Sequence, residues 1–271
     1  MTVSSVLFVG GGNMAGALMG GLVRSGWAPG AINVIEPEPS RRAELEARFG
    51  VRVLGAADRT LEGVDAVVWA VKPQLFQAAA APCAAHIAGA LQLSVMAGIR
   101  SDAIVRATGS ERVVRAMPNT PALIGQGISG LYARPAVSPD ECAAVERLLA
   151  PTGETVWVER EELLDAVTAL SGSGPAYVFY VLEALIDAGV ELGLSSAQSR
   201  QLALATLAGA TALARDADES PEVLRQRVTS KGGTTHAAIT ALDADGVKAA
   251  FLRALTAAKR RAAELGDEFG R

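Results

Sequence analysis

Cysteine, histidine and lysine are scarce in this chain of 271 residues, and basic residues are not in excess. Two cysteines, Cys83 and Cys142, are too few for a disulfide framework and fit a reducing compartment. With only two histidines, His86 and His236, the chain has no cluster of zinc-like spacing, so we expect no metal. A net charge of −4 argues against nucleic acid as the main partner.

Charged residues are also missing from residues 73–99, which raises the question of a membrane span. Glutamines, a histidine, a serine and an internal proline interrupt that stretch, so a buried helix followed by a buried strand explains it better. The first nine residues lack the basic segment of a signal peptide and run into glycines. The sequence therefore predicts a soluble, cytoplasmic protein without a membrane partner.

The first 160 residues alternate short β-branched runs with amphipathic segments. The predicted strands are 6–9, 32–35, 51–53, 66–70, 91–95, 113–116, 128–132 and 155–158. Predicted helices between them include 15–24, 41–49 and 139–149, the last with Ser138 as N-cap and Glu141 completing a capping box. Strands joined by helical crossovers predict an α/β fold with a mostly parallel, doubly wound sheet of the Rossmann type.

Long Ala/Leu-rich stretches replace this alternation after residue 160. They predict helices over 163–192, 197–214, 222–228 and 245–269. We therefore expect a Rossmann-type dinucleotide-binding domain over residues 1–160 and an all-helical domain over residues 161–271. Residues 203–214 are apolar nearly all round, which favours a homodimer formed through the helical domain.

A glycine-rich turn follows the first predicted strand. Gly10, Gly12 and Ala15 fit the dinucleotide fingerprint, in which small residues allow the tight turn, the approach of a pyrophosphate and the packing of helix on strand. Asn13 and Met14 belong to the helix start that would offer amide donors to the pyrophosphate.

The second predicted strand ends at an acidic residue that is followed by two arginines. Glu36 stands where an acid accepts the ribose hydroxyls of NADH, whereas Arg41 and Arg42 could hold the 2′-phosphate of NADPH. The alternative is that all three are solvated surface charges. The cofactor is thus NADPH or NADH, and the sequence does not decide between them.

Two further strand ends lie on the ligand side of such a sheet. The fourth predicted strand runs into Ala70, Val71, Lys72 and Pro73, and Asn119 follows the sixth. Lys72 is one of only four lysines, and it would lie beside the cofactor ribose unless it is a plain surface residue.

Two motifs lie in the helical half. Residues 170–177 place small residues and a proline inside a helical segment, which could be no more than a helix kink or a close contact between helices. In residues 228–236, a glycine pair precedes threonines at a helix start, where amide donors suit a carboxylate or a phosphate. The alternative there is a simple turn with Thr234 as N-cap.

Together these motifs make the chain resemble the pyrroline-5-carboxylate reductase family. The matching stretches are Gly-Gly-Gly-Asn-Met-Ala (10–15), Ala-Val-Lys-Pro-Gln (70–74), Met-Pro-Asn-Thr-Pro (117–121), Asp-Ala-Val-Thr-Ala-Leu-Ser-Gly-Ser-Gly-Pro-Ala-Tyr (165–177) and Val-Thr-Ser-Lys-Gly-Gly-Thr-Thr (228–235). Lys231 stands where the family commonly has proline. The resemblance implies an enzyme that reduces 1-pyrroline-5-carboxylate to L-proline by hydride from NAD(P)H, the last step of proline biosynthesis.

The resemblance also implies roles for individual residues. Thr235 would hydrogen-bond the ring nitrogen as the catalytic residue. Ser230, Gly233 and Thr234 would bind the substrate carboxylate, with Glu161 a weaker candidate on the substrate side. Val71, Lys72, Pro73 and Asn119 would line the nicotinamide and ribose end of the cofactor. His236 adjoins Thr235 and could act as an acid, although a solvent-facing position is the simpler interpretation.

The chemistry of an imine agrees with this composition. Reducing a ketone calls for a strong proton donor, yet residues 161–230 contain no lysine and no histidine. An imine can enter already protonated, so its site need only orient it and bind its carboxylate. A β-hydroxyacid-type dehydrogenase and a non-catalytic, dimeric NAD(P)-binding sensor remain the alternatives. Feedback inhibition by proline and assembly beyond a dimer stay open.

Overall fold

The structure is a computed structural model that describes residues 3–270. By its internal contacts the chain forms two units, one from the residues up to Gly174 together with those from Ala257 onward, the other from Pro175–Thr256. Residues 161–174 are thus grouped with the sheet. The boundary after residue 160 stays a prediction about the domains, and each unit is described by itself below.

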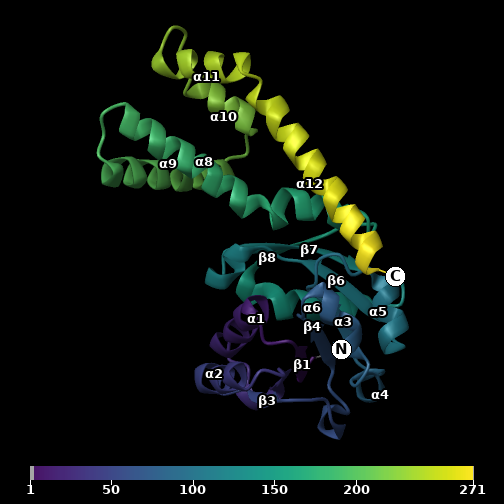
Figure 1. The fold of residues 1–271 in the computed structure, drawn as a ribbon. Coiled ribbons are helices and arrows are strands. Elements are labelled where there is room, and N and C mark those ends of the chain that lie inside the picture. The colour runs from purple at the N-terminus through teal and green to yellow at the C-terminus, as the bar shows by residue number, and fades with distance from the viewer. Residues whose placement is uncertain (1–2, 271) are drawn as a thin grey trace. The chain divides into compact units, whose positions relative to one another are not determined.

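The first unit is built on an eight-stranded, mostly parallel sheet in the order β3-β2-β1-β4-β5-β6-β7-β8 (Figure 1). The strands are β1 (Val6–Val9), β2 (Ile32–Ile35), β3 (Arg52–Leu54), β4 (Ala66–Trp69), β5 (Leu91–Ser94), β6 (Val113–Met117), β7 (Gly127–Ala133) and β8 (Gly153–Trp157). Among the strands of residues 3–270, β6 and β7 are the one antiparallel pair. Because β1 pairs with β2 on one side and β4 on the other, the chain reverses its winding direction at β1, where doubly wound sheets bind ligands.

Helices cover both faces of this sheet. One core contains Phe8 of β1 and the inner faces of α1 (Asn13–Arg24), α2 (Pro39–Phe49) and α6 (Pro139–Leu149). The other contains Leu7 of β1 and the inner faces of α3 (Phe76–Ala80), α4 (Ala84–Ile87) and α5 (Ser101–Thr108). Since successive strand residues point to opposite faces, burial on both sides explains why the inner strands β1 and β4 are apolar throughout.

The local signals of the sequence are confirmed where they fall on these elements. Every predicted strand is present, with bounds that differ by two residues at most. The Ser138–Glu141 capping box is formed, and α6 begins at Pro139 as predicted. Residues 73–99, without charge, form short helices and the buried strand β5 instead of one long span.

The stretch predicted as one helix over 163–192 is interrupted. It consists of α7 (Leu163–Val167), a π-helical turn (Thr168–Gly172) and α8 (Gly174–Glu191). Pro175 lacks a backbone N–H, and the glycines around it weaken a regular helix, so a change of helix type here has a local cause. Among the described residues, Leu163–Glu191 is the one stretch with the length and hydropathy of a membrane span, a test that buried helices of soluble proteins also pass.

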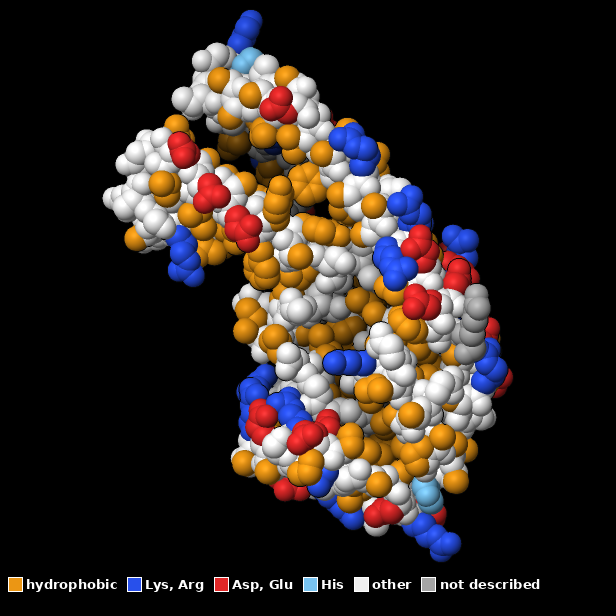
Figure 2. All heavy atoms as spheres, in the orientation of Figure 1, with side chains coloured by type: hydrophobic (Ala, Val, Ile, Leu, Met, Phe, Trp, Pro, Cys, Tyr) orange, Lys and Arg blue, Asp and Glu red, His pale blue; other side chains and the backbone are white. Residues whose placement is uncertain are grey.

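The second unit is helical. It contains α9 (Ser196–Asp216), α10 (Pro221–Arg227) and α11 (Thr234–Ala244), together with most of α8 and the first part of α12 (Val247–Phe269). Many large apolar side chains are exposed here; Phe179 and Tyr180 of α8 are 59% and 74% exposed. Hydrophobic side chains are visible over the surface of these helices in Figure 2. The unit does not bury its own apolar surface within one chain.

Candidate active site

A cavity of about 500 Å³ lies at the carboxyl ends of β1, β2 and β4. Its lining residues come from the ends of β1 and β2, from the segments after β1, β2, β3 and β4, and from α3 with the residues that follow it: Val9, Gly10, Gly11, Gly12, Ile35, Glu36, Pro37, Gly55, Ala56, Ala57, Ala70, Val71, Lys72, Leu75, Ala78, Ala79, Pro82 and Cys83. Most of the lining is apolar or backbone, and the charged side chains on it are those of Glu36 and Lys72. The volume and lining suit the adenosine half of a dinucleotide.

The glycine turn that opens this cavity has two glycines with different requirements. Gly10 has a φ of +99°, and a Cβ there would lie 2.8 Å from the carbonyl oxygen of Ala70, so both conformation and space demand glycine. Gly12 has ordinary extended backbone angles, and a Cβ there would meet nothing within 4 Å. Its missing side chain therefore leaves open space beside the cavity and relieves no crowding within the protein.

The start of α1 supplies the amide donors. Gly12 is the N-cap and offers no side chain to the first-turn amides, which include those of Asn13, Met14 and Ala15. Ala15 is fully buried against the sheet, as the fingerprint requires of a small residue. A 12-residue helix with an open N-terminus at a glycine turn fits a pyrophosphate.

Charged side chains at and after the end of β2 are hydrogen-bonded to backbone groups. Glu36 accepts hydrogen bonds from the amide of Gly11 (2.9 Å) and from the amide of Glu38 (3.0 Å). Arg41 donates from Nε to the carbonyl of Gly11 (2.7 Å) and pairs with Glu44. Arg42 donates to the carbonyls of Glu36 and Pro37. Neither arginine lines the cavity.

The opposite wall was not predicted from the sequence. It contains Ala56, Leu75 and Ala79, and Cys83, whose thiol donates to the carbonyl of Ala79 (3.2 Å). Burial raises the pKa of Cys83 to about 11, so the thiol stays protonated and acts as part of an apolar wall. Lys72, as the N-cap residue of the 3₁₀ turn Pro73–Leu75, lines the cavity and is exposed.

Asn119 lies outside this cavity and joins two motifs within the first unit. Its side-chain carbonyl accepts from the amide of Ile128 (3.0 Å), and its amide group donates to the hydroxyl of Ser171 (3.4 Å). A Cβ on Gly172 would lie 2.6 Å from the Met117 methyl carbon, so glycine is needed for this close approach. The loop after β6 and the π-helical turn are therefore in direct contact.

Glu161 is engaged by protein groups. Its carboxylate accepts from the backbone amide and the hydroxyl of Ser101, each at 2.6 Å, and from Arg115 at 2.8 Å. These contacts cap the start of α5 and neutralise a buried arginine. They describe a structural role, and the predicted contact of Glu161 with substrate stays a prediction.

The predicted substrate loop lies before α11, in the second unit. Gly232 has a φ of +76°, and Gly233 is the N-cap of α11 without a side-chain cap. The Ser230 hydroxyl oxygen would lie 2.6 Å from a Cβ on Gly233, so it lies directly over that glycine. Thr235 is half-buried, whereas His236 and Lys231 are exposed. Within residues 3–270, no side chain caps the first-turn amides of α11, and the hydroxyl side chain of Ser230 lies beside the N-cap.

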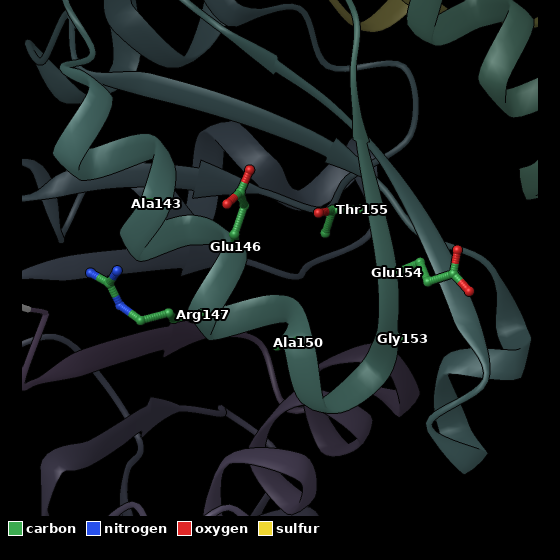
Figure 3. A pocket seen from close by; sticks show the side chains of 7 residues that line it. All are labelled: Ala143, Glu146, Arg147, Ala150, Gly153, Glu154 and Thr155. Atoms are coloured by element: carbon green, nitrogen blue, oxygen red, sulfur yellow. The ribbon is translucent and has the colours of Figure 1, made fainter.

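A second hollow, of about 450 Å³, has α6 and β8 as its walls (Figure 3). Its lining residues are Ala143, Glu146, Arg147, Ala150, Gly153, Glu154 and Thr155. None of the predicted site residues is among them, and its opposite charges favour no single ligand. No group of three or more metal-ligating side chains is found among residues 3–270.

The structure therefore brings together Gly10, Gly12, Glu36, Ala70, Val71 and Lys72 around one cavity. Asn13, Met14, Ala15 and Pro73 adjoin it in the chain. Arg41 does not line it but donates to the carbonyl of Gly11, which does, and Asn119 makes its contacts elsewhere. The loop with Ser230, Gly233, Thr234 and Thr235 belongs to the other unit.

Comparison with known proteins agrees with a dinucleotide-binding site in the first unit and a dimerisation domain in the helical part of the chain. A family model described as pyrroline-5-carboxylate reductase dimerisation matches residues 161–265, and one described as NADP oxidoreductase, coenzyme F420-dependent, matches residues 5–98. The pyrroline-5-carboxylate reductase of Pseudomonas aeruginosa is 41% identical over 272 residues, which cover 100% of both chains.

Solved structures extend this similarity. A pyrroline-5-carboxylate reductase from Coxiella burnetii has a TM-score of 0.91 and 35% identity, covering 97% of this chain and 99% of its own. A pyrroline carboxylate reductase from Plasmodium falciparum, solved with NADP bound, has a TM-score of 0.85 and 26% identity, covering 97% and 98%. The chain belongs to the pyrroline-5-carboxylate reductase family, whose members are oxidoreductases.

Proposed function

We propose that this chain reduces 1-pyrroline-5-carboxylate to L-proline with a hydride from NADH or NADPH, the last step of proline biosynthesis. The 41% identity to the Pseudomonas aeruginosa reductase over the full length of both chains supports the reaction. The observation that carries the substrate assignment is the open helix start at Gly233, with the Ser230 hydroxyl beside it, because a small carboxylate is the ligand that such a group of donors favours.

The cofactor would be held by the residues of the β1, β2 and β4 strand ends. The open first turn of α1 suits the pyrophosphate, and Glu36 suits the ribose hydroxyls. The apolar wall with Leu75 and Cys83 suits the adenine ring. When bound, the nicotinamide supplies the hydride for the reduction. Lys72 and Asn119 are proposed to orient the nicotinamide end.

Substrate binding is proposed to rest on the loop before α11. Gly233 as the N-cap, Thr234 at the first helical position and the Ser230 hydroxyl would hold the carboxylate of the substrate at the first-turn amides of α11, whereas the Gly233 amide itself donates to the Ser230 carbonyl (3.0 Å). Thr235 would hydrogen-bond the ring nitrogen and so fix which face of the imine is presented. Since effective positioning alone can lower a barrier by several kcal/mol, these contacts can supply most of the catalysis.

The site needs no strong acid of its own. A cyclic imine that enters as the protonated iminium already carries its proton on nitrogen. Addition of the hydride to the adjacent ring carbon then gives the secondary amine of proline with no further proton transfer. The exposed position of His236 agrees with this scheme, because a general acid would have to lie within hydrogen-bond reach of that nitrogen.

Self-association accompanies this function, since residues 161–265 match a dimerisation domain. We propose that the partner is a second copy and that the apolar faces of α8 and α9 form the contact. Leu202 and Leu213 of α9 are 55% and 62% exposed in one chain, which a dimer would correct. Two free thiols support a reducing, cytoplasmic location.

The reaction is tested by adding 1-pyrroline-5-carboxylate to the purified full chain with either reduced cofactor. We expect nicotinamide absorbance to fall and proline to form in equal amount. Parallel assays with 2-hydroxy and 2-keto acids are expected to give no change. Turnover of those acids would support the hydroxyacid dehydrogenase instead, and cofactor binding without turnover of any substrate would support the sensor.

A further inference from the structure

The proposed function leaves the choice between the two reduced cofactors open, and relatives do not decide it. The Plasmodium falciparum structure contains NADP but is only 26% identical to this chain. The two cofactors differ at one place, the adenosine 2′ position, which is a hydroxyl in NADH and a phosphate in NADPH. The deciding residues must therefore be those at the end of β2.

An acidic side chain faces the cavity at this place. Glu36 is half-buried and lines the cavity, and both of its oxygens accept from backbone amides, those of Gly11 and Glu38. No ion pair links it to a cation among the described residues. A carboxylate fixed in this way keeps its negative charge toward the ligand, where it can accept from hydroxyls and repel a phosphate.

The nearby cations are turned to other partners. Arg41 is held by the Gly11 carbonyl and by Glu44, and it lines a separate hollow together with Arg24 and Arg48. Arg42 donates to the backbone carbonyls of Glu36 and Pro37, and its Nη1 atom would lie 3.4 Å from a Cβ on Gly55, so its donors are engaged by the protein. Neither guanidinium group lines the cavity to receive a 2′-phosphate.

Both arrangements depend on the peptide groups of one residue, Gly11. Its N–H holds the Glu36 carboxylate, and its C=O holds Arg41. A Cβ at this position would lie 2.5 Å from Leu45 Cδ1 and 3.0 Å from Glu36 Oε2. Gly11 is thus packed too closely to accept a side chain without moving the carboxylate.

We propose that this chain selects NADH over NADPH, and that Gly11 is the positioning residue that keeps Glu36 at the ribose and Arg41 away from it. The proposal rests on the proposed function in one respect, that the cavity is the dinucleotide site. It adds a preference for NADH, and it adds Gly11 as a positioning residue that the dinucleotide fingerprint does not include.

The test measures binding without turnover. Calorimetry on the full chain gives dissociation constants for NADH and NADPH, and for ADP-ribose and its 2′-phosphate as fragments lacking nicotinamide. We expect NADH to bind at least about tenfold more tightly than NADPH, with the same order for the fragments. Glu36→Gln keeps the shape of the side chain and removes its charge, so the ratio of the NADPH dissociation constant to the NADH dissociation constant should fall about tenfold.

Glu38→Gln is the matched control, because it removes an equal charge two residues away whose side chain lies outside the cavity. It should leave the ratio within about twofold. Gly11→Ala should lower this ratio because NADH binds more weakly. An unfolding midpoint close to that of the wild type would show that the variant is folded. If that variant does not fold, Glu36→Gln alone decides.

Two results would overturn the inference while leaving the reductase intact: equal or tighter binding of NADPH by the wild type, or an unchanged ratio in Glu36→Gln. Failure of both cofactors and both fragments to bind would instead overturn the proposed function together with the inference.

Discussion

Arg115 of β6 and Glu161, which follows β8, form an ion pair of 2.8 Å in which the arginine is only 5% exposed. The ion pair is made by Nη1, and the buried Nε atom of Arg115 has no hydrogen-bond partner among the described residues. The same glutamate holds Ser101 at the start of α5. One carboxylate therefore connects the sheet, a covering helix and the segment that leads into α7.

Replacing Glu161 should destabilise the fold and leave substrate affinity alone. Glu161→Ala leaves a buried arginine unpaired and α5 without its cap, which should lower the free energy of unfolding by about 3 kcal/mol. Denaturant unfolding of the full chain measures this. Glu159→Ala, at an exposed position nearby, is the control and should cost under about 0.5 kcal/mol. A raised KM for the imine with unchanged stability would show instead that Glu161 binds substrate.

The two glycines of the fingerprint should respond differently to alanine. Gly12→Ala meets no neighbour, so the unfolding midpoint should stay near wild type while affinity for NAD(P)H falls at least about tenfold. Gly10→Ala combines a positive φ with a clash against Ala70 and should destabilise the protein itself. Thermal unfolding and cofactor titration on the same samples separate the two effects. Unchanged cofactor affinity in Gly12→Ala would place the pyrophosphate elsewhere.

Thr235 is expected to act on the substrate only. Thr235→Ala should lower kcat/KM for the imine by roughly tenfold to a hundredfold, the effect of losing one well-placed hydrogen bond, with cofactor affinity nearly intact. Thr240→Ala removes a hydroxyl that bonds to the His236 carbonyl on the exposed surface of the same helix, and it should leave kcat/KM unchanged. Loss of cofactor binding in Thr235→Ala would mean that this loop serves the cofactor.

Acid stability should depend on Glu141 of the α6 capping box. Burial acts to raise its pKa, but hydrogen bonds from the backbone and hydroxyl of Ser138 and from Arg112 outweigh this and hold the pKa below its usual value of 4.5. A lowered folded-state pKa contributes stability above pH 4.5 that is lost as the pH falls through the lowered value.

The free energy of unfolding should therefore drop between about pH 5 and about pH 3, and drop less in Glu141→Gln. Glu46→Gln, on the exposed face of α2, should follow the wild-type curve. Parallel curves for wild type and Glu141→Gln would show that the capping carboxylate contributes nothing to acid sensitivity.

The association of two chains gives a further prediction. Sedimentation of the wild type at micromolar concentration should show a dimer or larger species. Placing charges on α9 with Leu202→Glu and Leu213→Glu should shift the protein toward monomer, because both side chains are more than half exposed in the single chain. Arg200→Glu changes an exposed polar position of the same helix and is the control. A wild-type monomer would contradict the proposed contact.

The strands, the main caps and the glycine turn could be predicted because their signals are local. Strand β4 and the helix start at Ser138 depend on neighbours in the sequence, and the structure confirms them. The far wall of the cavity, with Leu75 and Cys83, could not be predicted in the same way. It depends on which helix the sheet brings beside β1, and apolar residues carry no signal of the ligand that they face.

The contacts of charged side chains were the second feature that could not be predicted from the sequence. The sequence placed Glu36 and Arg41 together as alternatives for one ligand, but their partners are peptide groups of Gly11 that only the folded turn presents. Glu161 likewise finds Ser101 and Arg115 far away along the chain. The small residues and the proline of 170–177 predicted a helix kink or a close contact between helices, but not the π-helical form of the turn at Thr168–Gly172, since small residues weaken a helix without fixing the form that results.

The central claim is direct hydride transfer from the nicotinamide to the carbon of a cyclic imine. It is tested by supplying reduced cofactor with both hydrogens of the hydride-donating carbon replaced by deuterium, together with 1-pyrroline-5-carboxylate, and analysing the product by mass spectrometry and NMR. We expect proline with one deuterium on the ring carbon that was double-bonded to nitrogen. Formation of unlabelled proline, or bound cofactor with no proline at all, would contradict it.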